Sequence, residues 1–389
     1  MIQIDADRTV ALLARLVSIN SVNPDLVPGA PGEGEIAAFL ADYCRAVGLE
    51  VRLQEAAPGR PNVIARLPGI DPRGGRSLIL NGHVDTVSTE RMTIPPLEPR
   101  IDGGRMYGRG AYDMKGGVAA MVAAVEAIRR VGLRLKGDVL LAMVADEEYA
   151  SLGTEAVVRE YRADAAIVTE PTGLDLCLAH KGFAWLRVET RGRAAHGSLF
   201  DEGVDAIVHM GRVLRGLEQI ETEELPRRRH PLLVRPSLHA ATVRGGLGLS
   251  TYPDRCTLEV ERRMLPAETP GGVEAEARGL LARLAAEDPR FSATVEVFFS
   301  RPGYEIAPDA PIVRAAEGAA RKVLGRTPRP TGVHAWLDSA ILGTAGIPTA
   351  IFGPGGEGAH AAVEYVLVDE VIACAGVLAE TIADFCGAL

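Results

Sequence analysis

Histidine and carboxylate side chains follow four apolar segments of the sequence, each with the composition of a buried β-strand. The segments and the residues that follow them are 77–82 with His83 and Asp85, 138–144 with Glu147 and Glu148, 164–169 with Glu170, and 347–352 with His360. In open α/β sheets, ligands bind beyond the carboxyl ends of strands, where side chains from separate strands converge. One such group alone is also typical of a polar strand end or a helix cap. The occurrence of all four in order favours a single site.

A further carboxylate, Asp113, lies in a glycine-rich loop that leads into a predicted helix at 116–130. Two histidines and several carboxylates, without cysteine, suit Zn²⁺, Co²⁺ or Mn²⁺. Clustered carboxylates without a cation repel one another, which raises their pKa values. Two metal ions ~3.5–4 Å apart require a bridging ligand, and a short aspartate on a loop can bridge them. The residue types therefore indicate a two-metal site.

The elements that must hold these residues alternate between helices and strands in the first and last parts of the chain. Beyond the segments above, the apolar spacing predicts helices at 7–17, 33–47, 153–161, 310–324, 336–345 and from about 368, and a strand at 61–67; residues 88–111 read as a loop. This rhythm predicts an α/β domain, with helices on both faces of a sheet.

The rhythm changes between residues 182 and 299. The predicted order there is strand, helix, strand, strand, helix, strand, at 183–190, 203–218, 238–243, 255–262, 271–286 and 293–299. This is the order of a ferredoxin-like α+β fold. We therefore expect an inserted domain at 182–299 within an α/β domain made of residues 1–181 and 300–389.

Composition excludes several classes of protein. The chain has 389 residues, with 51 acidic and 42 basic residues and a net charge of −9, which argues against nucleic acid and anionic membranes as partners. No apolar run is long enough to span a bilayer, and the first residues lack a secretory signal pattern. The five cysteines contain no C-x-x-C and read as free thiols of a reducing compartment. We expect a cytoplasmic protein.

Several motifs, taken together and in order, resemble those of one enzyme family. They are N-G-H-V-D-T-V (81–87), G-R-G-A-Y-D-M-K-G-G (108–117), D-E-E (146–148), T-E-P-T (169–172), H-K-G (180–182), G-R-A-A-H-G-S (192–198), E-R-R-M-L-P-A-E-T (261–269), W-L-D-S-A (336–340) and F-G-P-G-G-E-G-A-H-A-A-V-E-Y-V (352–366). The set is similar to the dinuclear zinc deacylases and carboxypeptidases, which include acetylornithine deacetylase, succinyl-diaminopimelate desuccinylase, aminoacylase and carboxypeptidase G. The resemblance covers essentially the whole chain. It implies a zinc-exopeptidase-like catalytic domain with a mixed sheet, and an inserted lid domain that also forms a homodimer.

The resemblance also implies the metal ligands. Asp113 would bridge the two ions, His83 and Glu170 would complete one site, and Glu148 and His360 the other. The expected metal is zinc, with cobalt or manganese as alternatives.

Two further carboxylates have implied roles beside the metals. The carboxylate of Asp85 would orient the imidazole of His83 without binding the metal itself. Glu147 would act as the general base on the attacking water and then return the proton to the leaving amine.

Substrate contacts follow from the same resemblance. His196 would stabilise the oxyanion, Arg263 would bind the substrate carboxylate, and the backbone of Gly353 and Gly355 would offer further contacts. His196 also fits a surface loop, and Arg263 a strand arginine in a salt bridge. Ser250 stands where many relatives have asparagine, which places the substrate contacts known from those relatives in question.

The predicted function is hydrolysis of the amide bond of a small N-acyl amino acid with a free carboxylate. A metallo-carboxypeptidase or dipeptidase, and an N-carbamoyl amino acid amidohydrolase, are the alternatives. A non-catalytic binding protein would be expected to lack Glu147 or a ligand, and all are present. A phosphate-binding protein would require a G-x-x-x-x-G-K-[ST] pattern, which is absent from the sequence.

Overall fold

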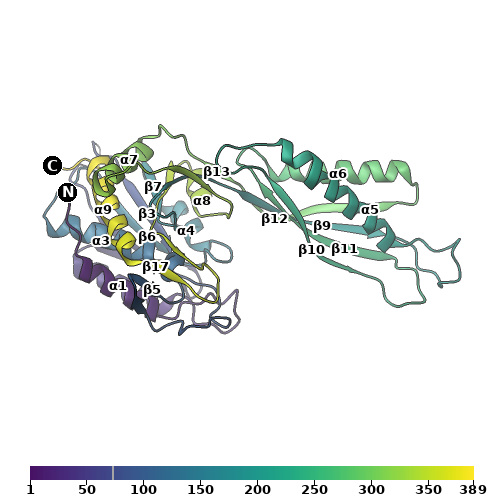
Figure 1. Cartoon of the computed structure of the whole chain (residues 1–389), viewed down its shortest axis with the longest axis horizontal. Helices are drawn as coiled ribbons and strands as arrows, with labels where there is room; N and C mark the ends of the chain where they lie inside the picture. Colours follow the sequence, from purple (N-terminus) through teal and green to yellow (C-terminus); the bar gives the residue numbers. More distant parts are fainter. Residues whose placement is uncertain (72–73) are drawn as a thin grey trace. The chain divides into compact units, whose positions relative to one another are not determined.

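The computed structural model describes residues 1–71 and 74–389, which divide into two compact units (Figure 1). The first unit contains Met1–Leu178, Ile306–Thr331 and Leu337–Leu389. The second unit contains Ala179–Glu305 and Gly332–Trp336. Compared with the predicted insertion at 182–299, the second unit is slightly longer at both ends and gains the segment 332–336.

The first unit contains most of the helices and strands. Its helices are α1 (Ala6–Ser18), α2 (Gly34–Val47), α3 (Gly116–Arg130), α4 (Leu152–Glu160), α7 (Pro311–Leu324), α8 (Ser339–Thr344) and α9 (Val368–Phe385), with the short turn η1 (Ala111–Lys115) before α3. Its strands are β1 (Glu50–Ala57), β2 (Arg60–Leu67), β3 (Leu78–His83), β4 (Arg100–Asp102), β5 (Arg105–Tyr107), β6 (Val139–Val144), β7 (Ala165–Val168), β15 (Thr349–Ile351), β16 (Gly356–Glu357) and β17 (Tyr365–Leu367). Strands β8 (Leu176–His180), β13 (Tyr304–Glu305) and β14 (Pro330–Val333) lie where the chain passes between the units.

A mixed sheet, in the order β1-β2-β6-β3-β7-β15-β8, forms the centre of the first unit. Strand β3 runs parallel to β6 and β7, and β15 runs parallel to β7, whereas β1 and β2 are antiparallel. The four strands predicted to carry the site are therefore parallel neighbours, and their carboxyl ends share one edge. All four are buried along their whole length, which explains why they appear as continuous apolar runs. The mixed α/β fold is confirmed.

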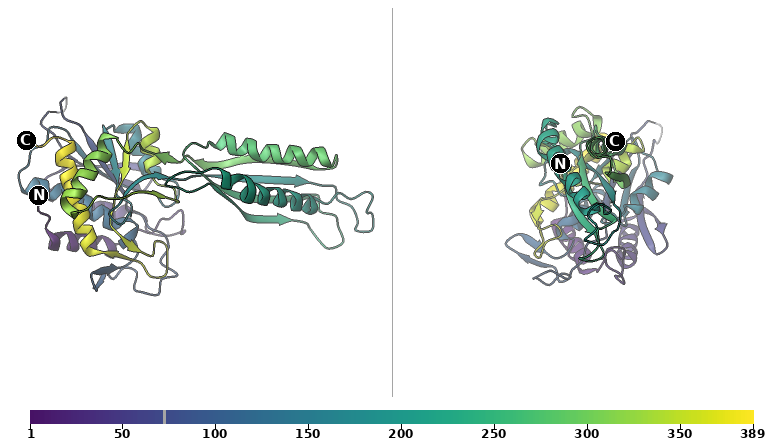
Figure 2. Two further views of the ribbon diagram at one scale, coloured as in Figure 1. Left: turned by 45° about the horizontal axis from the view of Figure 1, so that its top comes forward. Right: turned by 90° about the vertical axis from the view of Figure 1, so that its right-hand side faces the viewer.

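Helices cover both faces of this sheet. Successive residues of a strand point to opposite faces. On β3, Asn81 donates a hydrogen bond from Nδ2 to Thr154 Oγ1 of α4, whereas the neighbouring Gly82 lies against Val118 of α3. Helices α3 and α4 therefore cover opposite faces. On the α3 side, α7 and α9 lie side by side (Figure 2).

The second unit has the predicted element order. It contains β9 (Gly182–Arg191), α5 (Ala206–Gln219), β10 (Ser237–Gly245), β11 (Arg255–Met264), α6 (Pro270–Glu287) and β12 (Ser292–Arg301), with two short helical turns, η2 (Ile220–Glu224) and η3 (Leu225–Arg227), after α5. Its antiparallel sheet has the order β10-β11-β9-β12. Alternate residues of β9 are buried, and α5 and α6 run along the strands on that face (Figure 2). This is a ferredoxin-like arrangement.

The predicted loop at 88–111 is wrong in its second half, which contains the hairpin β4–β5. Its turn residues, Gly103 and Gly104, both have positive φ, as a two-residue type I′ turn requires. The flanking strands are too short and too exposed to give an alternating pattern. Within the described ranges, none of the helices has the length and apolarity needed to cross a membrane.

Candidate metal centre

His83 is the last residue of β3 and is almost completely buried. Its Nδ1 lies 3.0 Å from the carbonyl oxygen of Asp85. Because a carbonyl oxygen only accepts hydrogen bonds, Nδ1 must carry the proton that it donates. Nε2 points the other way, 3.1 Å from Asp113 Oδ1 and 3.5 Å from Glu170 Oε1. This tautomer leaves Nε2 as the ring atom that can bind a metal ion.

Asp113 lies between two groups of side chains. Its Oδ1 faces His83, and its Oδ2 lies 3.3 Å from His360 Nε2. The same His360 nitrogen is 2.9 Å from Glu148 Oε2. The structure therefore forms two triads of potential ligands, His83–Asp113–Glu170 and Asp113–Glu148–His360, which share Asp113. The family resemblance implied the same five residues in the same two groups.

The electrostatics of this cluster favour a bound cation. Burial raises the pKa of Glu170 well above its usual value, and the negative charge of Asp113 raises it further. Hydrogen bonds from His360 and His83 oppose the effect of burial and hold the pKa of Asp113 below its usual range. Hydrogen bonds to Asp113 and Glu148 raise the pKa of His360 to about 10. Nitrogen and oxygen ligands of this kind, without sulfur, fit divalent ions such as zinc.

Glu147 and Glu148 follow β6 in a turn that begins at Asp146, a buried residue with a φ of 69°. The carboxylate of Asp85 accepts both backbone N–H groups of the pair, with Oδ1 3.1 Å from the Glu147 nitrogen and Oδ2 3.2 Å from that of Glu148. The side chains of Glu147 and Glu148 have different surroundings. Glu148 belongs to a ligand triad, whereas the Glu147 carboxylate comes no closer to His83 Nε2 than 3.9 Å.

The predicted role of Asp85 requires one correction. Its carboxylate was expected to orient the His83 ring, but the nearest carboxylate oxygen is 3.6 Å from Nδ1, too far for a hydrogen bond. The backbone carbonyl of Asp85 makes that contact instead. The carboxylate is already engaged by the Glu147–Glu148 turn.

Sequence reasoning missed two residues behind this turn. Asn23 donates from Nδ2 to Asp85 Oδ2 at 2.8 Å and to Asp146 Oδ1 at 3.0 Å. Arg60 is buried and donates to both oxygens of Glu33 at 2.6 Å and to Asp146 Oδ1 at 3.0 Å. These contacts join segments far apart in the sequence, and no local pattern identifies them.

The backbone N–H groups of Gly353 and Gly355, which were predicted to contact the substrate, make hydrogen bonds within the protein in this structure. The N–H of Gly353 donates to Thr172 Oγ1 at 3.0 Å, and that of Gly355 donates to Glu370 Oε2 at 2.7 Å. A substrate would have to compete with these bonds for either N–H group, and the predicted contacts stay a prediction. A Cβ atom at position 353 would lie 2.3 Å from the carbonyl oxygen of Glu170, so glycine permits this loop to approach the Glu170 loop closely.

His196 and Ser250 belong to the second unit, and both are exposed. The N–H of Ser198 donates to His196 Nδ1 at 3.3 Å, which leaves Nε2 to carry the proton of the neutral ring. Ser250 lies in the turn after β10, where its carbonyl accepts a hydrogen bond from Gly197 at 2.8 Å. His196 thus presents an N–H donor at the surface of this unit.

Arg262 and Arg263 are neighbours on β11 with different environments. Arg262 is fully buried and donates to Glu268 at 2.7 Å. Arg263 is partly exposed, lies 5.4 Å from the centre of the Phe183 ring, and pairs with Glu261 at 2.9 Å. Arg263 is therefore the one of the two that a ligand can reach.

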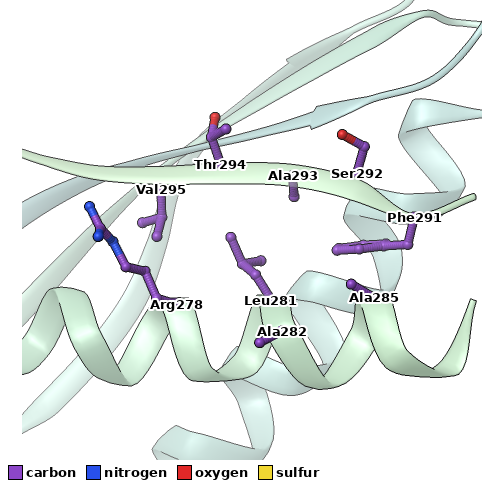
Figure 3. Close-up of a pocket in the computed structure, with 9 residues that line it drawn as sticks. All are labelled: Arg278, Leu281, Ala282, Ala285, Phe291, Ser292, Ala293, Thr294 and Val295. Atoms are coloured by element: carbon purple, nitrogen blue, oxygen red, sulfur yellow. The ribbon is translucent and has the colours of Figure 1, made fainter. Parts of the chain in front are cut away.

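A groove of about 480 Å³ lies between α6 and β12 in the second unit. Figure 3 shows Leu281 pointing from the helix toward the strand, with the ring of Phe291 between the two elements. None of the predicted site residues lines this groove. It gives no support to a second reactive centre.

Comparison with known proteins identifies relatives along nearly the whole chain. The model of peptidase family M20/M25/M40 matches residues 79–384. The chain is 30% identical to N-formyl-4-amino-5-aminomethyl-2-methylpyrimidine deformylase of Bacillus subtilis, over 98% of this chain and 95% of the relative. It is also 30% identical to acetylornithine deacetylase of Myxococcus xanthus, over 97% of both proteins. The fold is similar to that of aminopeptidase PepT from Bacillus cereus, with a TM-score of 0.81 and 22% identity over 98% of this chain and 99% of that one.

Proposed function

The chain belongs to peptidase family M20/M25/M40 and is a metal-dependent hydrolase of amide bonds, and on this basis we propose that it removes the acyl group from a small N-acyl amino acid, using two divalent ions. The observation that carries the proposal is the pair of ligand triads that share Asp113. We propose zinc as the metal, with cobalt and manganese as the alternatives, because the ligands are imidazoles and carboxylates.

The residues of the centre have complementary tasks. His83 and Glu170 would hold one ion, Glu148 and His360 the other, and Asp113 both. Two divalent ions held there polarise an amide carbonyl and make water more acidic.

Glu147 is free of these triads and would take a proton from the attacking water and return it to the leaving amine. Burial and the neighbouring carboxylates raise its pKa well above the usual value for glutamate. A carboxyl group with a raised pKa can accept the proton and later release it.

The second unit would supply the substrate contacts. We propose that Arg263 binds the carboxylate of the substrate and that the Nε2–H of His196 stabilises the oxyanion. Ser250, beside the His196 loop, would offer a hydroxyl to the substrate. The two curated relatives reported above are named a deformylase and a deacetylase, which favours a deacylase over a carboxypeptidase, a dipeptidase or an N-carbamoyl hydrolase.

We propose that two copies of the chain associate through the second unit. Strand β10 is an edge strand of its sheet and is mostly exposed, and the turn after it presents the exposed side chains of Leu247 and Leu249. An exposed edge next to apolar side chains is a template for pairing with a second chain. The proposed cytoplasmic location is supported by the five cysteines, which are buried and are not joined in disulfides.

The experiment that tests this function is a metal titration of the apoprotein coupled to a hydrolysis screen. Released amine would be measured across N-acetyl, N-formyl, N-succinyl and N-carbamoyl amino acids and dipeptides. Activity that saturates near two ions per chain supports the two-metal site, and the best substrate selects among the alternatives. Failure to bind divalent ions tightly would refute the ligand assignment.

A further inference from the structure

We propose that a buried ion pair, Arg109–Glu364, positions Asp113 and His360 relative to each other and thereby determines the affinity of the centre for its metal ions. The inference rests on the proposed two-metal function. Neither residue touches the reacting atoms, so both are positioning residues.

Glu364 is fully buried, and its carboxylate is directed at the loop that carries Asp113. Oε1 accepts the backbone N–H groups of Tyr112 and Asp113, at 3.0 and 3.1 Å. Oε2 accepts the N–H of Gly110 at 3.0 Å. One side chain therefore fixes three peptide groups of this loop, including the peptide nitrogen of the shared ligand itself.

Arg109 completes the pair and extends it to two other loops. Its Nη1 donates to Glu364 Oε2 at 2.6 Å, and the side chain is almost completely buried. Its Nε donates to the carbonyl of Ser88, in the loop that follows His83, at 3.2 Å. Its Nη2 donates to the carbonyl of Ala361, the residue after His360, at 3.2 Å. The pair thus joins the three segments that carry His83, Asp113 and His360.

His360 has few other constraints on its position. Its side chain is 54% exposed, and the residue has a φ of 59°, a left-handed conformation that is unfavourable for a non-glycine residue. It lies between β16 and β17, outside any helix or strand. Since only four positions separate it from Glu364, the anchored carboxylate limits how far His360 can move from Asp113.

Four hydrogen bonds to one buried carboxylate make this pair sensitive to small changes in charge. A buried charge is tolerated because its partners remain in place, and removal of one partner leaves the other unpaired. Outer residues that orient metal ligands typically change metal affinity about 10–100-fold when mutated. The geometry therefore predicts an effect on metal affinity that exceeds the effect of an ion pair that lies away from the metal ligands.

The test compares Glu364→Gln with the wild-type protein in an equilibrium competition for Zn²⁺ against a chromophoric chelator. Glutamine has nearly the same shape, but its amide group directs N–H donors at the N–H groups that Glu364 accepts. We expect the affinity for the more weakly held ion to fall about 10–100-fold, with kcat partly restored in excess metal. Arg109→Lys keeps the positive charge but loses the planar guanidinium group, so it should lower the affinity for the same ion.

The matched control is Glu268→Gln in the second unit. Glu268 is a mostly buried carboxylate, with 15% of its side chain exposed, and it accepts hydrogen bonds from Arg262 and Arg228, both at 2.7 Å, and from the N–H of Leu265 at 2.8 Å. This variant should lower the melting temperature of the apoprotein without changing the affinity for Zn²⁺. Because it removes the same kind of ion pair, it separates lost stability from lost positioning.

The outcomes distinguish this inference from the proposed function. The positioning role is overturned if Glu364→Gln binds two ions with wild-type affinity, or if Glu268→Gln loses as much affinity as Glu364→Gln. Either result leaves the two-metal function in place. A wild-type protein that fails to bind two ions overturns both. If Glu364→Gln does not fold, Arg109→Lys decides the question with the same measurement.

Discussion

The adjacent glutamates after β6 allow the clearest test of the proposed chemistry, because the same substitution at each should have a different effect. Glu147 lies outside both triads, whereas Glu148 Oε2 is 2.9 Å from His360 Nε2 and belongs to one of them. Both backbone N–H groups are held by Asp85, and glutamine leaves these contacts unchanged. Neither substitution should therefore disturb the turn itself.

In Glu147→Gln, the proposed general base is lost while all the proposed ligands remain. General acid–base catalysis contributes about 10²–10⁴-fold, so kcat should fall by this factor, which corresponds to an increase of about 2.7–5.5 kcal/mol in the activation barrier. The protein should still contain two ions per chain. In Glu148→Gln, one anionic ligand is replaced by a neutral amide, so the second ion should be held more weakly and activity should partly return in excess metal.

The assay combines metal analysis after dialysis with kcat measured over a series of metal concentrations for both variants. The two profiles should differ in kind: low kcat with full metal content for Glu147→Gln, and metal-dependent kcat for Glu148→Gln. Loss of an ion from Glu147→Gln would show that Glu147 is a ligand. Full retention of both ions at wild-type affinity by Glu148→Gln would refute the second triad.

Three other expectations concern the second unit. Arg263→Lys should raise KM for carboxylate substrates more than for uncharged amide analogues, since lysine cannot form a bidentate contact; equal effects would exclude the carboxylate assignment. Burial lowers the pKa of His180 to about 4, so the unfolded chain binds this proton first as the pH falls, and the free energy of unfolding should decrease between pH 6.5 and 4, by up to about 3 kcal/mol. Urea unfolding of metal-free His180→Gln should lack this part of the pH dependence, and identical slopes would contradict the burial argument. Val243→Lys on the exposed strand β10 should shift the sedimentation coefficient from dimer to monomer, whereas an unchanged dimer would place the interface elsewhere.

The residues that approach one another at the metal centre were predictable because two simple rules coincide there. Strands buried on both faces give continuous apolar runs, and parallel neighbours end at one edge, so His83, Glu148 and Glu170 could be assigned to one place. His360 follows another such strand and Asp113 lies in a glycine-rich segment before a helix, so both were also candidates, and the family resemblance implied the role of each. Their roles as ligands remain predictions.

What the sequence could not indicate is how these residues are held. Asn23, Arg60 and Glu364 contact partners far away in the chain, and each contact depends on the distance between loops rather than on local spacing. Asp85 makes two separate kinds of contact: its carbonyl oxygen accepts a hydrogen bond from His83, and its carboxylate accepts two from the Glu147–Glu148 turn. Which group makes which contact also depends on the folded backbone. Sequence patterns specify residue types, but they do not specify which atom of a residue makes a contact.

The unequal exposure of the two histidines has a kinetic consequence. His83 is 1% exposed and His360 is 54% exposed, so solvent reaches one triad much more readily than the other. An ion at the His360 triad should therefore exchange faster, and a chelator should remove it first. Partial demetallation would then yield a defined one-ion form, in which His83 and Glu170 hold the remaining ion.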